Sequence, residues 1–105
     1  MKLPLSSRNW MPRNISNIFW MVPIVDTIDI GFTKEFLDSL GTIWAFIPSE
    51  SSTLSVGKTF ANIESGRKLL PLKSPIAGAV VQWNEKFLEY PDKIVSTEYI
   101  LKVKQ

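Results

Sequence analysis

The chain lacks cysteine and histidine altogether, although it is 105 residues long. The absence of cysteine excludes a disulfide scaffold and a thiol nucleophile, and the absence of both residues excludes the common zinc sites and an imidazole base. Aspartate and glutamate are scattered without the spacing of a calcium loop, so we expect no metal site. No nucleophile–base pair or phosphate-binding loop is visible either. These absences predict that the protein is not an enzyme.

Long apolar runs and a large excess of charge are missing as well. No stretch approaches the length of a membrane-spanning helix, and a formal net charge of +2 is too small to predict nucleic-acid binding. We therefore expect neither a membrane nor a nucleic acid as partner. Four basic residues form at most a modest patch, which is either an ordinary solvated face or a docking site for an acidic partner: Lys58, Arg67, Lys68 and Lys73.

What the chain does contain fits one small domain with a single core, since 45% of its residues are hydrophobic. Residues 33–40 show helical spacing, with Thr33 as a cap at the start and Gly41 at the end. Other short apolar or alternating stretches predict strands at residues 24–30, 43–47, 59–63, 79–83 and 99–103. The pattern predicts an all-β sandwich or barrel with one short helix. The aromatic residues expected in its core are Trp20, Trp44 and Trp83.

Residues 63–78 form the most informative segment. They predict two short strands around a tight basic turn, Gly66-Arg67-Lys68. A second turn follows at Ser-Pro-x-x-Gly, where Pro75 fixes its φ angle and Gly78 adopts conformations that other residues resist. Both of these residues are therefore expected to serve the geometry of the turn.

The spacing between this segment and other features resembles the H protein of the glycine cleavage system, a lipoyl-carrier family. Trp20 stands eleven residues before Gly31, and the triplet 31–33 stands nine before Leu40-Gly41, as in the family. Further matches are Pro48, Gly57-Lys58, Glu64-Ser65, residues 74–80 and Asn84-Glu85. The resemblance covers about residues 18–103. It implies a barrel-sandwich hybrid fold for a domain at residues 17–105.

Members of this family carry lipoate on a lysine at the hairpin tip and pass an aminomethyl group between the glycine cleavage enzymes. In this chain Arg67 occupies the position of that lysine. Ile18 replaces the family's histidine before the first tryptophan, and the family's Gly-x-Gly-Trp loop is missing between Ser96 and Tyr99. The resemblance therefore implies an H-protein-like carrier that departs from its relatives at the attachment position.

Attachment of lipoate requires an amine lone pair that attacks an activated acyl group. A lysine amine can supply it, whereas the guanidinium of Arg67 keeps its proton and delocalises its lone pairs. Lys68 is the remaining candidate for lipoyl attachment. A shift of one residue along a β-ladder turns a side chain to the opposite face, so Lys68 presents poorly unless Gly66 permits a bulge. Two hypotheses stay open: a lipoyl carrier modified at Lys68, and a non-lipoylated H-like scaffold.

The partners implied by the resemblance are the other glycine cleavage enzymes or a lipoate-attaching enzyme. Glu64 is the residue near the hairpin tip that the family implies in recognition by such a partner. Its simpler interpretation is a strand residue whose carboxylate faces water or pairs with Lys73 across the hairpin. Both roles can hold together.

Residues 1–16 precede the part of the chain that matches the family. They contain basic residues and several serines but no acidic residue, as organellar transit peptides do. The simpler interpretation is a polar N-terminal extension. We expect a cytoplasmic protein, with a mitochondrial one as the alternative if this segment directs import.

Overall fold

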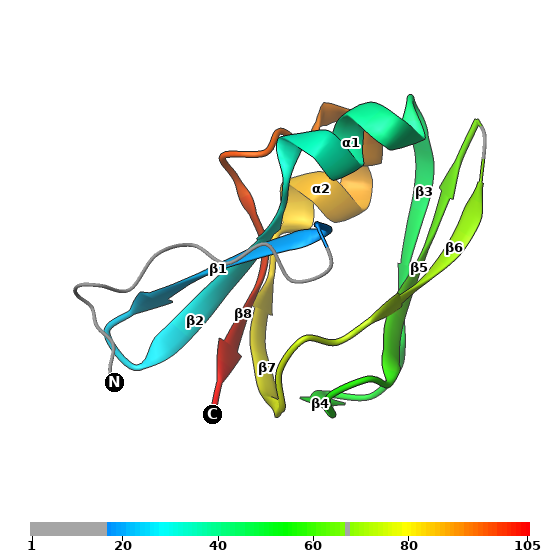
Figure 1. The fold of residues 1–105 in the computed structure, drawn as a ribbon. Helices are drawn as coiled ribbons and strands as arrows, with labels where there is room; N and C mark the ends of the chain where they lie inside the picture. The colour runs from blue at the N-terminus through cyan, green and yellow to red at the C-terminus, as the bar shows by residue number, and fades with distance from the viewer. Residues whose placement is uncertain (1–16, 67) are drawn as a thin grey trace.

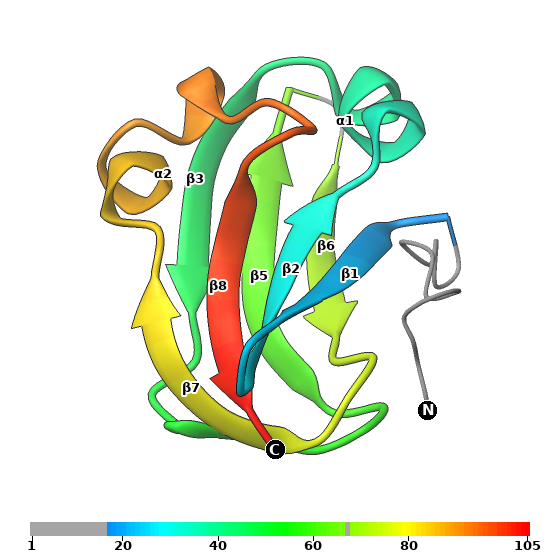
Figure 2. The same ribbon diagram turned by 90° about the vertical axis from the view of Figure 1, so that its left-hand side faces the viewer.

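The computed structural model describes residues 17–66 and 68–105. The extension at residues 1–16 lies outside the described residues, and so does Arg67. Two antiparallel sheets pack face to face, as Figures 1 and 2 show. The larger has the strand order β1 (Phe19–Ile24), β2 (Thr27–Phe32), β8 (Tyr99–Lys104), β7 (Gly78–Trp83) and β4 (Thr53–Leu54). The smaller has the order β3 (Ile43–Pro48), β5 (Thr59–Ser65) and β6 (Leu69–Lys73). The predicted all-β fold is confirmed.

Short helices cover one end of this double layer (Figure 1). The predicted helix is α1 (Lys34–Leu40), and its start is capped by Thr33, whose side chain accepts a hydrogen bond from the Phe36 N–H. Gly41 ends it with a φ of 74°. Two further turns were not predicted: α2 (Glu85–Glu89) and the 3₁₀ turn η1 (Pro91–Lys93). The signal for α2 was Asn84, whose side chain caps it at both Lys86 and Phe87.

The predicted strand at residues 24–30 is wrong in its bounds. Ile24 ends β1 and pairs with Thr27 at the start of β2, so the chain reverses at Val25 and Asp26. Val25 takes a φ of 56°, a conformation that β-branched residues rarely adopt. The alternation of apolar and polar residues misled the prediction because a two-residue loop does not interrupt a period of two.

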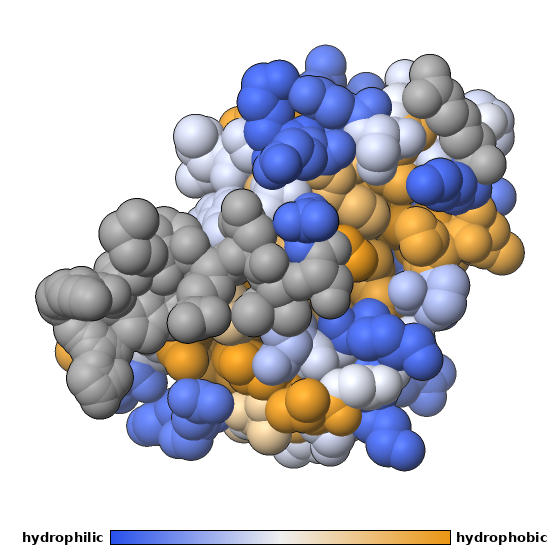
Figure 3. Space-filling view, viewed as in Figure 1, coloured by the Kyte–Doolittle hydropathy of each residue, from blue (hydrophilic) through white to orange (hydrophobic). Residues whose placement is uncertain are grey.

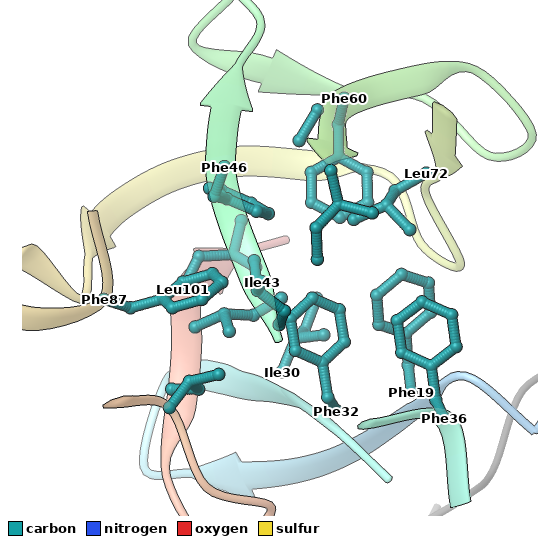
Figure 4. Packing of buried hydrophobic residues seen from close by; sticks show 14 of the residues in the cluster. Phe19, Ile30, Phe32, Phe36, Ile43, Phe46, Phe60, Leu72, Phe87 and Leu101 are labelled. Carbon is teal, nitrogen blue, oxygen red and sulfur yellow. The ribbon is translucent and has the colours of Figure 1, made fainter. Parts of the chain in front are cut away.

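Phenylalanine dominates the core between the sheets (Figure 4). The Phe32 ring is fully buried, and its centroid lies 5.2 Å from that of Phe36 and 5.8 Å from those of Phe19 and Phe87. Aliphatic side chains from both sheets fill the remaining space, among them Ile30, Ile63, Leu72 and Leu101. One contiguous core therefore joins the two sheets and holds the three-stranded sheet in place.

The three tryptophans do not share one environment, in contrast to the prediction. Trp83 is partly buried and packs against Phe46, with 5.7 Å between the ring centroids. Trp20 lies opposite Gly31 in the β1–β2 ladder, and a Cβ atom at Gly31 would stand 2.1 Å from the Trp20 ring. Trp44 is 63% exposed, so its assignment to the core is wrong. It stands at a bulge of β3, between Ile43 and Ala45, where the alternation that sets burial breaks.

Candidate functional site

The hairpin of β5 and β6 is regular up to its tip. Ile63 pairs with Leu70 and Glu64 pairs with Leu69, and the register shift in this ladder lies at the opposite end, between Thr59 and Ala61. Beyond Glu64, the Ser65 N–H donates to the Lys68 carbonyl over 2.8 Å. The cross-strand hydrogen bonding of the hairpin therefore extends as far as Ser65 and Lys68.

Lys68 is the last paired residue of the hairpin and does not occupy its apex. Its backbone N–H donates to the Ser65 Oγ over 3.2 Å, in addition to the bond that its carbonyl accepts. The bulge that would reorient Lys68 is not formed at this end of the ladder. The glycines with positive φ among the described residues are Gly41, Gly57 and Gly78, so Gly66 does not use that freedom. The side chain of Lys68 is exposed.

The base of the tip is fixed to neighbouring elements. The Gly66 N–H donates to the Thr42 carbonyl over 3.2 Å, which links the hairpin to the connection between α1 and β3. Ser65 is 5% exposed and pairs with Ile43 of β3. Trp44 adjoins the same place, since a Cβ atom built on Gly66 would lie 3.6 Å from its ring. The backbone at Ser65 and Gly66 is therefore hydrogen-bonded to β3 and to the connection between α1 and β3.

The two faces of the hairpin differ. Side chains of Ile63 and Leu72 point into the core, whereas Glu64 and Leu69 belong to the outer set and are exposed. Lys68 precedes β6 and is exposed as well.

Glu64 stands in the middle strand, between Ala45 of β3 and Leu69 of β6. Lys73 is paired with Thr59, at the far end of the hairpin, so the expected contact between Glu64 and Lys73 is wrong. Within residues 17–66 and 68–105, Glu64 forms no ion pair. Its carboxylate faces water beside the tip, which leaves the recognition role open to a partner.

The second predicted turn supports the other end of the hairpin. Ser74 is 3% exposed, its Oγ donates to the Ile76 carbonyl over 2.6 Å, and its N–H donates to the Lys58 carbonyl over 2.8 Å. Gly78 has a φ of 157°, and a Cβ atom there would lie 2.7 Å from the Lys104 carbonyl oxygen. The glycine is therefore required where β7 passes β8 closely, which is the structural role expected of it.

Sequence reasoning missed one residue beside the tip. Trp44 lies next to Gly66, yet it was assigned to the core because its neighbours Ile43 and Phe46 are apolar and buried. The pairing of Ile43 with Ser65 and of Ala45 with Glu64 sets Trp44 apart as an unpaired bulge residue. A continuous apolar run gives no signal for such a bulge.

Two further features are absent from the described part of the chain. No group of three or more acidic, histidine or cysteine side chains lies close enough to hold a metal ion among these residues. No helix in this part of the chain is long and apolar enough to cross a membrane.

Comparison with known proteins decides the family. The family model described as "Glycine cleavage H-protein" matches residues 13–105. The chain belongs to the glycine cleavage H-protein family. It is 37% identical over 71 residues to a glycine cleavage system H protein of Trichormus variabilis, an alignment that covers 67% of this chain and 55% of that protein. The glycine cleavage system H protein of Coprothermobacter proteolyticus is 32% identical over 82 residues, an alignment that covers 76% of this chain and 65% of that protein. The chain thus spans little more than half the length of the Trichormus protein.

A solved structure shows the same fold. The crystal structure of a glycine cleavage system H protein from Mycobacterium marinum superimposes with a TM-score of 0.73, covering 86% of this chain and 80% of that one, at 20% sequence identity. The expected barrel-sandwich hybrid fold is therefore confirmed. Members of the glycine cleavage H-protein family are lipoyl carriers.

Proposed function

We propose that this chain is an H-protein-type domain that docks on the partner enzymes of its family without a lipoyl arm. The observation that supports the proposal is a β5–β6 hairpin paired as far as Glu64 and Leu69, together with Arg67 at the position that spacing from Glu64 and Ser74 aligns with the family's lysine. The pairing of β5 with β6 continues in register to Glu64 and Leu69. The chain therefore keeps the hairpin while a guanidinium replaces the reactive amine.

The chemistry of the tip supports this assignment. An acylation at position 67 needs a nucleophilic nitrogen, and a guanidinium that stays protonated above pH ~12 does not provide one. Both the backbone N–H and the carbonyl of Lys68 form hydrogen bonds with Ser65, on the opposite strand of the hairpin. Presentation of Lys68 to a lipoate-attaching enzyme would require these bonds to Ser65 to open.

The second candidate function is a lipoyl carrier modified at Lys68. One observation favours it: the Lys68 side chain is exposed and stands one residue from the attachment position. In that case the arm would emerge one residue beyond the position that spacing aligns with the family's lysine. Lipoate is thus a possible cofactor of this chain only through Lys68.

Intact mass spectrometry after incubation with a lipoate ligase, ATP and lipoate separates the two functions. We expect the wild-type mass to remain unchanged and the variant Arg67→Lys to gain one lipoyl adduct. The double variant Arg67→Lys/Lys68→Ala is the matched control, and it should gain the same adduct. An adduct on the wild-type chain that is lost in Lys68→Ala would overturn the armless function and establish the carrier.

A further inference from the structure

The outer face of the three-stranded sheet is apolar beside the hairpin tip. We define the outer sheet face as the exposed or half-exposed residues of β3, β5 and β6 that point away from the core: Trp44, Ala45, Ile47, Asn62, Glu64, Leu69, Pro71 and Lys73. Trp44, Ile47 and Leu69 are 63%, 54% and 72% exposed. In Figure 3 a hydrophobic area lies on the side where Figure 1 places β5 and β6.

These side chains form ordered rows across the sheet. Ala45, Glu64 and Leu69 stand in one row, and Ile47, Asn62 and Pro71 stand in the next. Scattered exposed apolar residues are normal on a protein surface, but rows of adjacent ones mark an interaction site. This face is continuous with the tip, because Trp44 adjoins Gly66.

Lysines without an ion pair among the described residues lie on this apolar face, at Lys73, and next to its strands, at Lys58 and Lys68. Residues 42–75 contain four basic residues and two acidic ones. The three described lysines among them, Lys58, Lys68 and Lys73, are exposed and form no ion pair within the described residues. We propose that the outer sheet face docks a partner protein whose contact surface presents apolar side chains among carboxylates. This inference rests on the proposed function and names the chemistry of its partner.

A second copy of the chain fits this face poorly. Two such faces placed against each other would bring lysines of like charge together. A symmetric dimer through this face would therefore leave these lysines without carboxylate partners, so a different molecule has to supply the carboxylates.

An anionic membrane fits less well than a protein. Glu64 lies at the centre of the first row and Asn62 at the centre of the second, both exposed. A carboxylate at the centre of an inserting face is repelled by anionic headgroups and costs free energy to bury unpaired. A protein surface can offer a single donor to Glu64 and carboxylates to the surrounding lysines.

The test uses defined probes and does not depend on knowing the partner. A short peptide that alternates leucine with glutamate is titrated into the isotope-labelled chain, and a leucine–lysine peptide of equal length is the comparison. We expect shift changes at Trp44, Ile47 and Leu69, and an affinity at least about tenfold higher for the glutamate peptide. Equal affinities, or shifts confined to other surfaces, would overturn the proposal.

Matched variants locate the contact. Leu69→Ser and Lys73→Glu should each weaken binding of the glutamate peptide by about tenfold. Val81→Ser and Lys104→Glu make comparable changes at exposed residues of the five-stranded sheet and should leave binding unchanged. Binding to phosphatidylserine vesicles that is lost in Leu69→Ser would replace the protein partner by a membrane. If the peptide binds as expected while the chain fails to bind glycine cleavage enzymes, the surface stands and the proposed function fails.

Discussion

The two sheets share one core, but their outer surfaces differ in ion pairing and in exposed apolar side chains. On the five-stranded sheet and its helices, most lysines pair with carboxylates, and the four ion pairs among the described residues all lie there. On the three-stranded sheet and its turns, Lys58, Lys68 and Lys73 form no ion pair within the described residues, and Trp44 and Leu69 face water. The contrast indicates that the second surface is the one open to a partner.

The largest effect should separate the shared core from the outer face. Phe32→Ala removes a fully buried ring that contacts Phe19, Phe36 and Phe87, and it should lower the free energy of unfolding by about 3–5 kcal/mol. Trp44→Ala should change it by less than about 0.5 kcal/mol, because the ring is largely exposed. Urea denaturation measures both. A large loss of unfolding free energy in Trp44→Ala would show that this residue stabilises the fold and would contradict its assignment to a docking surface.

A second prediction concerns the contact between Trp20 and Gly31 in the five-stranded sheet. Trp20 packs on Gly31, and its indole N–H donates to the Ser96 carbonyl over 2.6 Å, so Gly31→Ala forces the ring away. We expect a loss of about 1–3 kcal/mol in unfolding free energy. In a Trp20→Ala background the same substitution should cost little, because the clash is gone. Equal costs in both backgrounds would contradict the packing described for this pair.

The matched and unmatched lysines provide the third comparison. Lys102 bonds Asp29 over 2.8 Å and stands 4.4 Å from the Tyr99 ring centroid, with both charged side chains mostly buried. Lys102→Ala should lower the unfolding free energy by about 1 kcal/mol, whereas Lys73→Ala should have almost no effect. Thermal unfolding of the two variants distinguishes them. A comparable loss in Lys73→Ala would mean that this lysine has a structural role.

The smallest effect concerns a fully exposed pair on α1. The hydrogen bond and the charge of Asp38 raise the pKa of Lys34 above its ordinary value of 10.5. The associated stabilisation is present at neutral pH and is lost only as the pH rises through the raised pKa, in strongly alkaline solution. Asp38→Asn should return the pKa of Lys34 toward its ordinary value in an NMR titration, with almost no change in stability at pH 7. An unchanged pKa would show that the pair does not persist in solution.

Much of the fold was predictable because its signals are local. Helix α1 was found from the cap at Thr33 and the glycine at Gly41, and both act as predicted. The turn at Val25 and Asp26 was missed because Val25 is an unusual residue for positive φ. Helix α2 was missed because its five residues are too few to establish a periodic pattern.

The candidate site was only partly accessible from the sequence. The hairpin and the identity of position 67 followed from spacing, and the structure adds that Lys68 is bonded to Ser65. The exposure of Trp44 depends on a bulge opposite Ser65 and Glu64, which is set by strand register over long sequence distances. The outer sheet face therefore emerged only when β3, β5 and β6 were placed side by side.

The most direct test of an H-type domain that docks without an arm is a competition experiment. The rate at which a glycine-decarboxylating enzyme works with a conventional lipoylated H protein is measured while this chain is added. We expect the rate to fall, because the chain occupies the enzyme's docking site for the H protein and accepts no aminomethyl group. An unchanged rate would contradict docking, and turnover supported by this chain alone would contradict the loss of the arm.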